Sequence, residues 1–146
     1  MKKITKISFL TIIFIVLANI SFSSEKYFYE GVKLFEKEKY DEAKFLFERS
    51  IVFDPKHSNS YLYLAKIYKN AEDKKNEEKN LEATLLIDPT NEEAILMLME
   101  ISLEKTNYLK VKELSKKFTK VCIYLCNENK KILKELENLE PKNNES

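Results

Sequence analysis

The amino-acid sequence predicts an all-α fold built from repeated helix pairs, and three observations lead to this prediction. The 146-residue chain contains one Gly and three Pro, whereas a β-sandwich or barrel of this length needs many more turn residues. Lys, Glu and Leu, which favour helices, are abundant. The dipeptide Asp54-Pro55 recurs as Asp88-Pro89. This spacing of 34 residues matches a repeated helix–turn–helix unit.

The composition is that of a folded chain without a strong charge. Hydrophobic residues make up 44% and charged residues 34%, which leaves enough apolar side chains for a core. The formal net charge is +1. Without Lys2, Lys3 and Lys6, which lie in a segment expected to be removed, 22 basic residues face 24 acidic ones. No basic stripe stands out, so nucleic acid is not an expected partner.

Residues 1–23 have the pattern of a secretory signal peptide. Three lysines precede an apolar run from Ile7 to Ile20, and Ser21 and Ser23 supply the small residues at which cleavage is expected, after Ser23. The alternative is an uncleaved inner-membrane anchor, although the run is shorter than the roughly 20 residues of a spanning helix. Either reading predicts an exported protein of the periplasm or cell envelope.

The first repeat spans residues 24–57. Apolar residues recur at helical spacing from Tyr27 to Phe35, a polar turn follows at 36–39, and a second helical pattern runs from Tyr40 to Ile51. Pro55 ends this second helix, because proline cannot continue a helix and disfavours the helical conformation in the residue before it.

This repeat resembles a tetratricopeptide-repeat (TPR) unit. The matching residues are Tyr27, Gly31, Tyr40, Ala43, Phe47, Ser50 and Pro55. The resemblance places Gly31 at a close contact between two helices, where leucine would overpack. Alanine there is expected to destabilise the fold less than leucine does, or even to stabilise it by lowering the entropy of the unfolded chain if the backbone is helical.

The resemblance continues, more weakly, through two further units and a terminal helix. Residues 58–91 match at Tyr61, Leu64, Ala65, Tyr68, Leu81, Thr84 and Pro89, but not at Lys74 and Glu77. Residues 92–125 form a degenerate unit that keeps Ala94, Leu98 and Tyr108. An amphipathic segment at about 125–139 suits a capping helix, and residues 140–146 form a flexible tail. The family then implies a right-handed superhelical stack of antiparallel helix pairs, a TPR-like α-solenoid.

Catalytic chemistry, metals and cofactors are not expected. His57 is the only histidine, and it falls in the turn between the first two units, where we expect it to be exposed to solvent. Acidic residues occur as adjacent pairs rather than as a spaced cluster. The sequence therefore predicts a protein that is not an enzyme.

Cys122 and Cys126 are the only cysteines, and their spacing predicts one face of a single helix. Outside the cytoplasm they can oxidise, although a disulfide at that helical spacing is expected to require local distortion. The alternatives are buried free thiols, a disulfide, or a metal or redox site. Two cysteines without neighbouring histidines are too few for a structural zinc site.

TPR proteins bind peptides or helices in the groove lined by the first helix of each unit. Carried onto this sequence, the resemblance assigns partner binding to Phe28, Val32, Phe35, Leu62, Lys66, Lys69, Leu96, Glu100 and Leu103. Most are apolar, which favours a protein or an amphipathic helical peptide as the partner. The alternative is that they pack on the protein's own helices. We therefore expect an envelope adaptor or scaffold, or alternatively a structural subunit of an envelope assembly that self-associates or is anchored by its N-terminal segment.

Overall fold

A computed structural model describes residues 23–139, so residues 1–22 of the expected signal segment 1–23 and the tail 140–146 lie outside the described residues. Within this range the chain forms helices and no strands, as the sequence predicts. None of these helices combines the length and apolar character that crossing a membrane requires.

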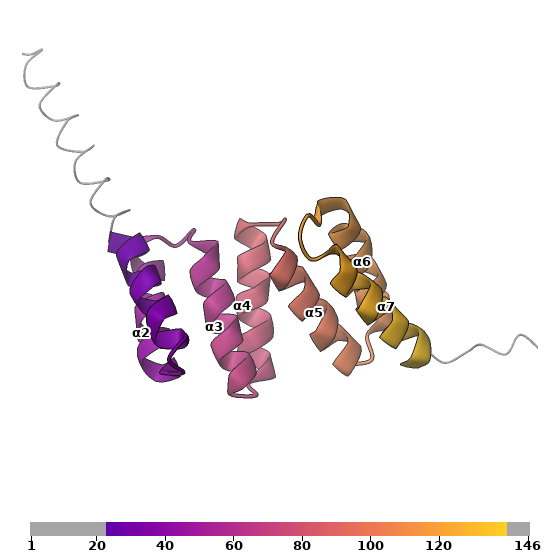
Figure 1. Cartoon of the computed structure of the whole chain (residues 1–146), viewed down its shortest axis with the longest axis horizontal. Coiled ribbons are helices and arrows are strands. Elements are labelled where there is room, and N and C mark those ends of the chain that lie inside the picture. Colours follow the sequence, from indigo (N-terminus) through magenta and orange to yellow (C-terminus); the bar gives the residue numbers. More distant parts are fainter. Residues whose placement is uncertain (1–22, 140–146) are drawn as a thin grey trace, which may run out of the picture. The chain divides into compact units, whose positions relative to one another are not determined.

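The helices begin at intervals that repeat along the chain (Figure 1). After a first helix at 23–35 come α2 (Tyr40–Phe53), α3 (Ser58–Asn70), α4 (Lys74–Ile87), α5 (Glu92–Glu104), α6 (Tyr108–Val121) and α7 (Cys126–Leu139). The starts of α2, α4 and α6 are 34 residues apart, and so are those of α3, α5 and α7. The terminal helix α7 therefore stands where the first helix of a fourth pair would begin.

The turn inside each helix pair also recurs at this interval. Glu38, Glu72 and Thr106 have φ angles of 59°, 55° and 54°, and each ends the turn-forming stretch after the first helix of its pair. The left-handed conformation is costly for a residue with a Cβ atom. The side chains of Asp73 and Asn107 then accept the backbone N–H groups of Asn76 and Lys110 at the next helix and offset part of this cost.

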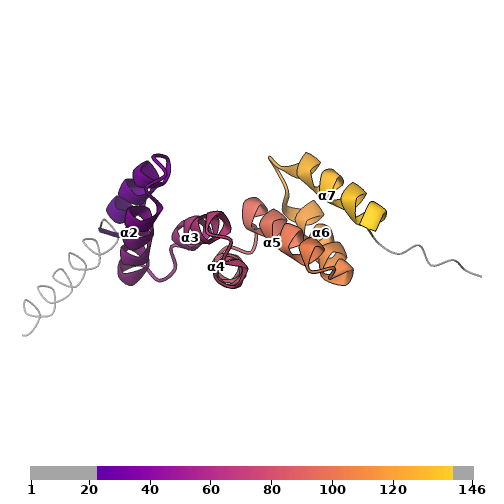
Figure 2. The ribbon, with the colours of Figure 1, turned by 90° about the horizontal axis from the view of Figure 1, so that it is seen from below.

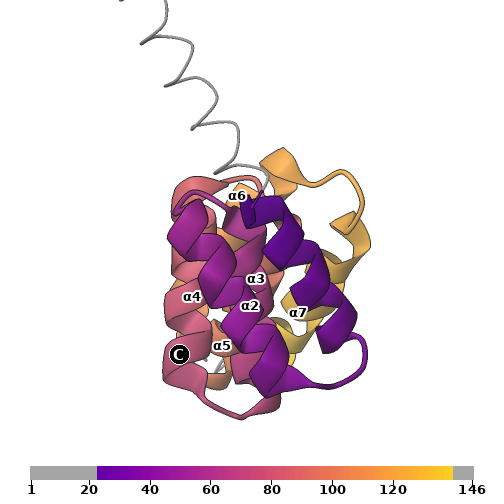
Figure 3. The same ribbon diagram turned by 90° about the vertical axis from the view of Figure 1, so that its left-hand side faces the viewer.

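Two compact units make up the described chain, one up to Ile67 and one from Tyr68. In the first unit, the first helix lies beside α2 (Figure 3) at Gly31, where the ring of Phe47 packs against the backbone. A Cβ atom on Gly31 would lie 2.8 Å from Cε1 of Phe47. The close contact implied at Gly31 is present, and a methyl group there would require the ring of Phe47 to shift.

The second unit is centred on α5, which packs against α4, α6 and α7 (Figure 2). Nearly all of α5 is buried, from Ala94 to Leu103 with the exception of Glu100. A helix that is apolar on most sides must be covered by its neighbours. Ile95 and Met99 form a cluster with Val111 and Phe118 of α6, while Ile132 and Leu136 of α7 close the same core.

Glu77 of α4 keeps the register of the repeat although it departs from the TPR pattern. Its side chain is 1% exposed, and the residues 34 positions before and after it, Ala43 and Val111, are buried as well. Loss of solvation is the main cause that raises the pKa of Glu77, while Lys74, 3.5 Å away, opposes this shift. The Oε2 atom of Glu77 has no hydrogen-bond partner. A carboxyl group thus occupies a core position that its equivalents fill with apolar side chains.

Candidate functional site

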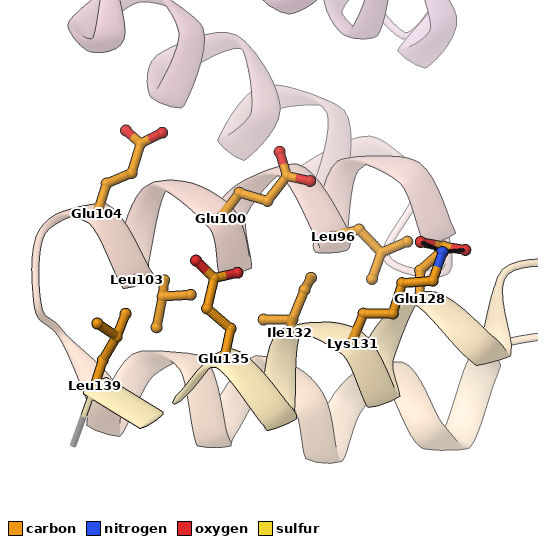
Figure 4. A pocket seen from close by; sticks show the side chains of 9 residues that line it. All are labelled: Leu96, Glu100, Leu103, Glu104, Glu128, Lys131, Ile132, Glu135 and Leu139. Atoms are coloured by element: carbon orange, nitrogen blue, oxygen red, sulfur yellow. Dashed lines mark hydrogen bonds and ion pairs between the residues drawn. The ribbon is translucent and has the colours of Figure 1, made fainter. Parts of the chain in front are cut away.

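A groove runs between α5 and α7 in the second unit (Figure 4). Helix α5 supplies one wall because its apolar surface exceeds what α4 and α6 cover. Helix α7 supplies the other, because its apolar stripe of Ile132 and Leu136 docks on α5 and α6 and leaves its polar side chains along the edge. The cavity has a volume of about 440 Å³, within the range of known ligand sites.

Apolar side chains form the floor of the groove and carboxylates form its rim. The floor consists of Leu96, Leu103, Ile132 and Leu139, and the rim carries Glu100, Glu104, Glu128, Lys131 and Glu135. In Figure 4 the side chain of Glu135 extends from α7 toward α5, above the floor. Four carboxylates and one ammonium group therefore surround an apolar strip.

Three of the rim carboxylates are already engaged by lysines. Lys69 lies 2.7 Å from Glu100, Lys74 lies 3.0 Å from Glu104, and Lys131 lies 2.8 Å from Glu128. The hydrogen bond to Glu104 is the main cause that raises the pKa of Lys74. These pairs are exposed to water, where the net gain of an ion pair is small. A cationic ligand can therefore replace a lysine at this rim at little cost.

Both ends of α7 are fixed to the rest of the second unit. At its C-terminal end, the hydroxyl of Tyr108 donates to the carbonyl of Leu139 at 3.2 Å. At its N-terminal end, the carboxylate of Glu92 on α5 accepts the backbone N–H groups of Ile123, Tyr124 and Leu125, at 2.7 Å for the first and last. The α7 wall of the groove is thus held in place relative to α5.

Glu92 is suited to this role by its charge state. Partial loss of solvation acts to raise the pKa of its carboxyl group, but the backbone hydrogen bonds from Leu125, Ile123 and Tyr124 outweigh it and leave the pKa below the ordinary value. A carboxylate that accepts several N–H groups is stabilised in its charged form. Glu92 is therefore ionised at neutral pH and remains a strong acceptor.

The two cysteines lie on different elements, so their expected place on one helix is wrong. Cys122 is the C-cap of α6 and Cys126 is the first residue of α7. The structure joins them in a disulfide with a Cα–Cα distance of 5.3 Å. Because the helix is broken between the two cysteines, the distortion expected of a disulfide within a continuous helix does not arise.

The nine residues assigned to partner binding fall into two groups. Leu96, Glu100 and Leu103 line the α5–α7 groove, and Lys69 pairs with Glu100 at its rim. The resemblance assigned partner binding to none of the α7 residues that form the opposite wall of the groove. The amphipathic stripe of the terminal helix was the available signal, but the family pattern draws its binding residues from the first helices of the repeats.

The other five assigned residues belong to the first unit, where several pack inside it. Phe28 and Leu62 are buried, and Val32, Phe35 and Lys66 are half-buried. The ring of Tyr63 lies 5.5 Å from that of Phe28 and 5.2 Å from that of Phe35. The ammonium group of Lys66 also lies over the ring of Tyr63, 4.6 Å from the ring centre. These contacts support self-packing at Phe28 and Phe35.

The expected exposure of His57 is wrong. Its side chain is only 10% exposed, and its ring lies 4.7 Å from the ring of Phe28. Nδ1 accepts the backbone N–H of Ser60 at 3.2 Å, and Glu25 lies 3.5 Å from Nε2. The Ser60 hydroxyl is within 2.9 Å of Nδ1, but Ser60 is fully buried. The contact between Nδ1 and the N–H of Ser60 shows that His57 caps the start of α3.

Comparisons with known proteins find the same arrangement of helices in solved structures. No family model and no curated protein matches the chain. The TPR2B domain of yeast Sti1, solved as a complex with pHsp70, matches with a TM-score of 0.74 at 14% identity, covering 82% of this chain and all of that one. The Yersinia enterocolitica type III secretion chaperone SycD, in complex with a peptide of the translocator YopD, gives 0.70 at 13% identity and covers 78% and 92%.

The first TPR of Spaghetti (RPAP3), bound to the HSP90 peptide SRMEEVD, matches with a TM-score of 0.68 at 18% identity and covers 80% of this chain and 98% of that one. At these identities the likeness establishes the fold. The chain has the tetratricopeptide-repeat fold.

Proposed function

We propose that this protein with a tetratricopeptide-repeat fold is an exported adaptor that holds a segment of a partner protein in the α5–α7 groove. The observation that carries the proposal is the groove itself, a cavity of about 440 Å³ with an apolar floor, between two helices that are fixed to each other. Leu96, Leu103 and Ile132 of the floor are largely buried, and Leu139 is half exposed. A concave site with an apolar floor and a polar rim is a common sign of a binding site.

The solved relatives support a protein segment as the ligand. Three of the similar structures contain peptides or complexes of other proteins, of HSP90, Hsp70 and the translocator YopD. The rim of this groove adds a preference. Glu135 is exposed and stands over the floor, and three further carboxylates are paired only at the surface. A segment with large apolar side chains flanked by Lys or Arg fits this distribution.

Two observations support export. The lysine-rich start, the short apolar run and the small residues before Ser24 have the pattern of a signal peptide. The disulfide between Cys122 and Cys126 is the state expected in an oxidising compartment. We therefore place the adaptor in the periplasm or cell envelope. Binding without catalysis is proposed because the groove is lined by leucine, isoleucine, glutamate and lysine, with no histidine, serine or cysteine among them.

A photo-crosslinking amino acid at position 139 tests the groove in the native envelope. Leu139 is 50% exposed and lines the groove, whereas Leu109 is 79% exposed on α6 and lies outside it. We expect a discrete crosslinked partner from position 139 and none from position 109. Equal adducts at both positions would contradict the proposal.

Charge reversal on α7 then separates the groove from the rest of the helix surface. Glu135→Lys should abolish the crosslink from position 139, because it repels a cationic segment at the rim. Glu137→Lys is the matched control, since Glu137 is exposed on the same helix but does not line the groove. Loss of the crosslink in both variants would show a non-specific charge effect.

A further inference from the structure

The loop between α6 and α7 presents two large apolar side chains to solvent. Ile123 is 75% exposed and Tyr124 is 87% exposed, and they are adjacent at the tip of the loop. Single exposed apolar residues are normal on protein surfaces. An adjacent pair at a loop tip is a less common arrangement and indicates a contact with something outside the chain.

The backbone of this tip is held in place by a disulfide and by hydrogen bonds to α5. The disulfide between Cys122 and Cys126 closes the loop, and Glu92 accepts the N–H groups of the three residues between the cysteines. With its backbone fixed by these contacts, the loop loses little conformational entropy when its tip binds a surface. The structure therefore presents Ile123 and Tyr124 as a preorganised knob.

The equivalent turns of the repeat have a different character. Cys122 lies 34 residues after Asp88 and 68 after Asp54, and each of the three residues caps the second helix of its pair. The earlier turns continue with Pro55 and Pro89, as suits a turn that ends a helix. The fold thus permits a polar turn at this place, so the exposed pair in the third turn is not required by the architecture.

Lysines flank the loop on both sides. Residues 116–134 contain six lysines and one acidic residue, Glu128, a formal net charge of +5, so the rest of the chain carries −4. Glu128 pairs with Lys131. Lys116 and Lys120 are exposed one turn apart at the end of α6, and Lys130 and Lys134 are exposed one turn apart at the start of α7. The knob therefore lies within a strongly basic stretch of the chain.

We propose that this loop docks on an anionic lipid surface. Ile123 and Tyr124 enter the interfacial region of the bilayer, where tyrosine is favoured, and the flanking lysines bind the phosphate headgroups. A convex tip of two side chains offers no groove in which a partner protein segment could lie, whereas a bilayer interface accepts such a tip. The contact does not require the N-terminal segment, and none of Ile123, Tyr124, Lys120 and Lys130 lines the α5–α7 groove.

Tryptophan fluorescence tests the proposal directly, because the chain contains no Trp. The full chain carrying Tyr124→Trp is mixed with vesicles of phosphatidylglycerol and phosphatidylcholine, or of phosphatidylcholine alone. The apolar N-terminal segment can bring the chain to either vesicle, so the readout is local: the emission maximum and quenching by lipids brominated in their chains. We expect a blue shift and strong quenching with the anionic vesicles only.

Leu109→Trp is the matched control, at an exposed apolar position near the opposite end of α6. It should show neither change. In the Tyr124→Trp background, Lys120→Gln with Lys130→Gln should lower the equilibrium constant for docking about thirtyfold, at about 1 kcal/mol per lysine. Lys75→Gln with Lys79→Gln, two exposed lysines of α4 outside the basic stretch, should leave it unchanged.

Two results would overturn the proposal. The first is a Tyr124→Trp spectrum that is the same with both kinds of vesicle, or a shift in the Leu109→Trp control of equal size. The second is a shift with an acidic polypeptide such as polyglutamate and none with vesicles, which would assign the basic loop to an acidic protein. Circular dichroism of each variant confirms that the helices are retained, as expected for substitutions at exposed positions.

Discussion

Replacing Gly31 by alanine should destabilise the protein, against the usual advantage of alanine in a helix. The added Cβ atom would meet three ring carbons of Phe47, at 2.8, 3.0 and 3.1 Å. Phe47 is fully buried, and its ring is held between Phe28 at 5.9 Å and Tyr63 at 5.1 Å. The ring therefore has little room to move away from the new methyl group.

The magnitude follows from two opposing contributions. Overpacking of a well-packed core costs about 1–3 kcal/mol, and alanine in place of glycine within a helix returns about 0.5–1 kcal/mol. The free energy of unfolding should therefore fall by up to about 2.5 kcal/mol in Gly31→Ala. Gly31→Leu brings three more carbon atoms into the same contact and should cost more.

Urea denaturation of four proteins tests the assignment as a double-mutant cycle: the native chain, Gly31→Ala, Phe47→Leu and the double variant. Phe47→Leu alone lowers stability because it leaves a cavity. In that background the methyl group has space, so Gly31→Ala should become neutral or stabilising. Additive effects of the two substitutions would refute the contact, because touching residues are expected to couple.

Two further predictions concern the second unit. Glu77→Gln should raise the free energy of unfolding at pH 7 by about 1 kcal/mol, because it removes a buried charge that lacks a full set of partners. The fold raises the pKa of Glu77, so ionisation of this carboxyl group lowers stability as the pH rises from 4.5 through the raised pKa. Urea melts at several pH values should therefore show the difference between Glu77 and Gln vanishing below pH 4.5. Replacing both Cys122 and Cys126 by serine should lower the free energy of unfolding by about 2 kcal/mol relative to the oxidised native chain, the loop-closure value for so short a loop. Reducing the native chain is the control and should cause a similar loss, whereas reductant should not affect the serine variant. A loss of equal size on treating the serine variant with reductant would be inconsistent with the disulfide as its cause.

The helical repeat could be predicted from the sequence because its signals are local. Pro55 and Pro89 mark the ends of α2 and α4, and the interval between them is the interval at which the helices begin. The left-handed turn at Glu38, Glu72 and Thr106 left no such signal, because none of the three is glycine or asparagine. The helices could thus be placed without knowledge of the turns between them.

The sequence predicts the start of the capping helix at about residue 125, close to the observed start of α7 at Cys126, but the residues at the break carry no local signal for it. Val121 to Cys126 contains no proline, glycine or polar turn residue, so its local preferences allow a helix to continue. The interactions that favour the break are distant in sequence, since Glu92 lies 31 to 33 residues before the N–H groups that it accepts. An isolated reading of these residues therefore gives one helix with two cysteines on its face.

The burial of His57 and of Glu77 cannot be inferred from the polarity of their side chains. Each has a polar side chain in a segment that reads as surface, and each is covered by residues from another helix or turn. The ring of Phe28 covers His57, and Glu77 occupies the core position that Ala43 and Val111 fill in the other pairs. Sequence position within the repeat, rather than polarity, was the better indicator of burial for Glu77.

The disulfide connects the proposed compartment to the proposed groove. Helix α7 stands where a fourth helix pair would begin, but it has no second helix to pack against within the described residues, so its position depends on the packing of Ile132 and Leu136 and on its two ends. One end is bound through Tyr108, and the other through the loop that Cys122 and Cys126 close over Glu92. In a reducing compartment the loop would keep the Glu92 hydrogen bonds but lose its covalent closure. The α7 wall of the groove is therefore most firmly fixed in an oxidising environment, which is where the N-terminal segment would direct the chain.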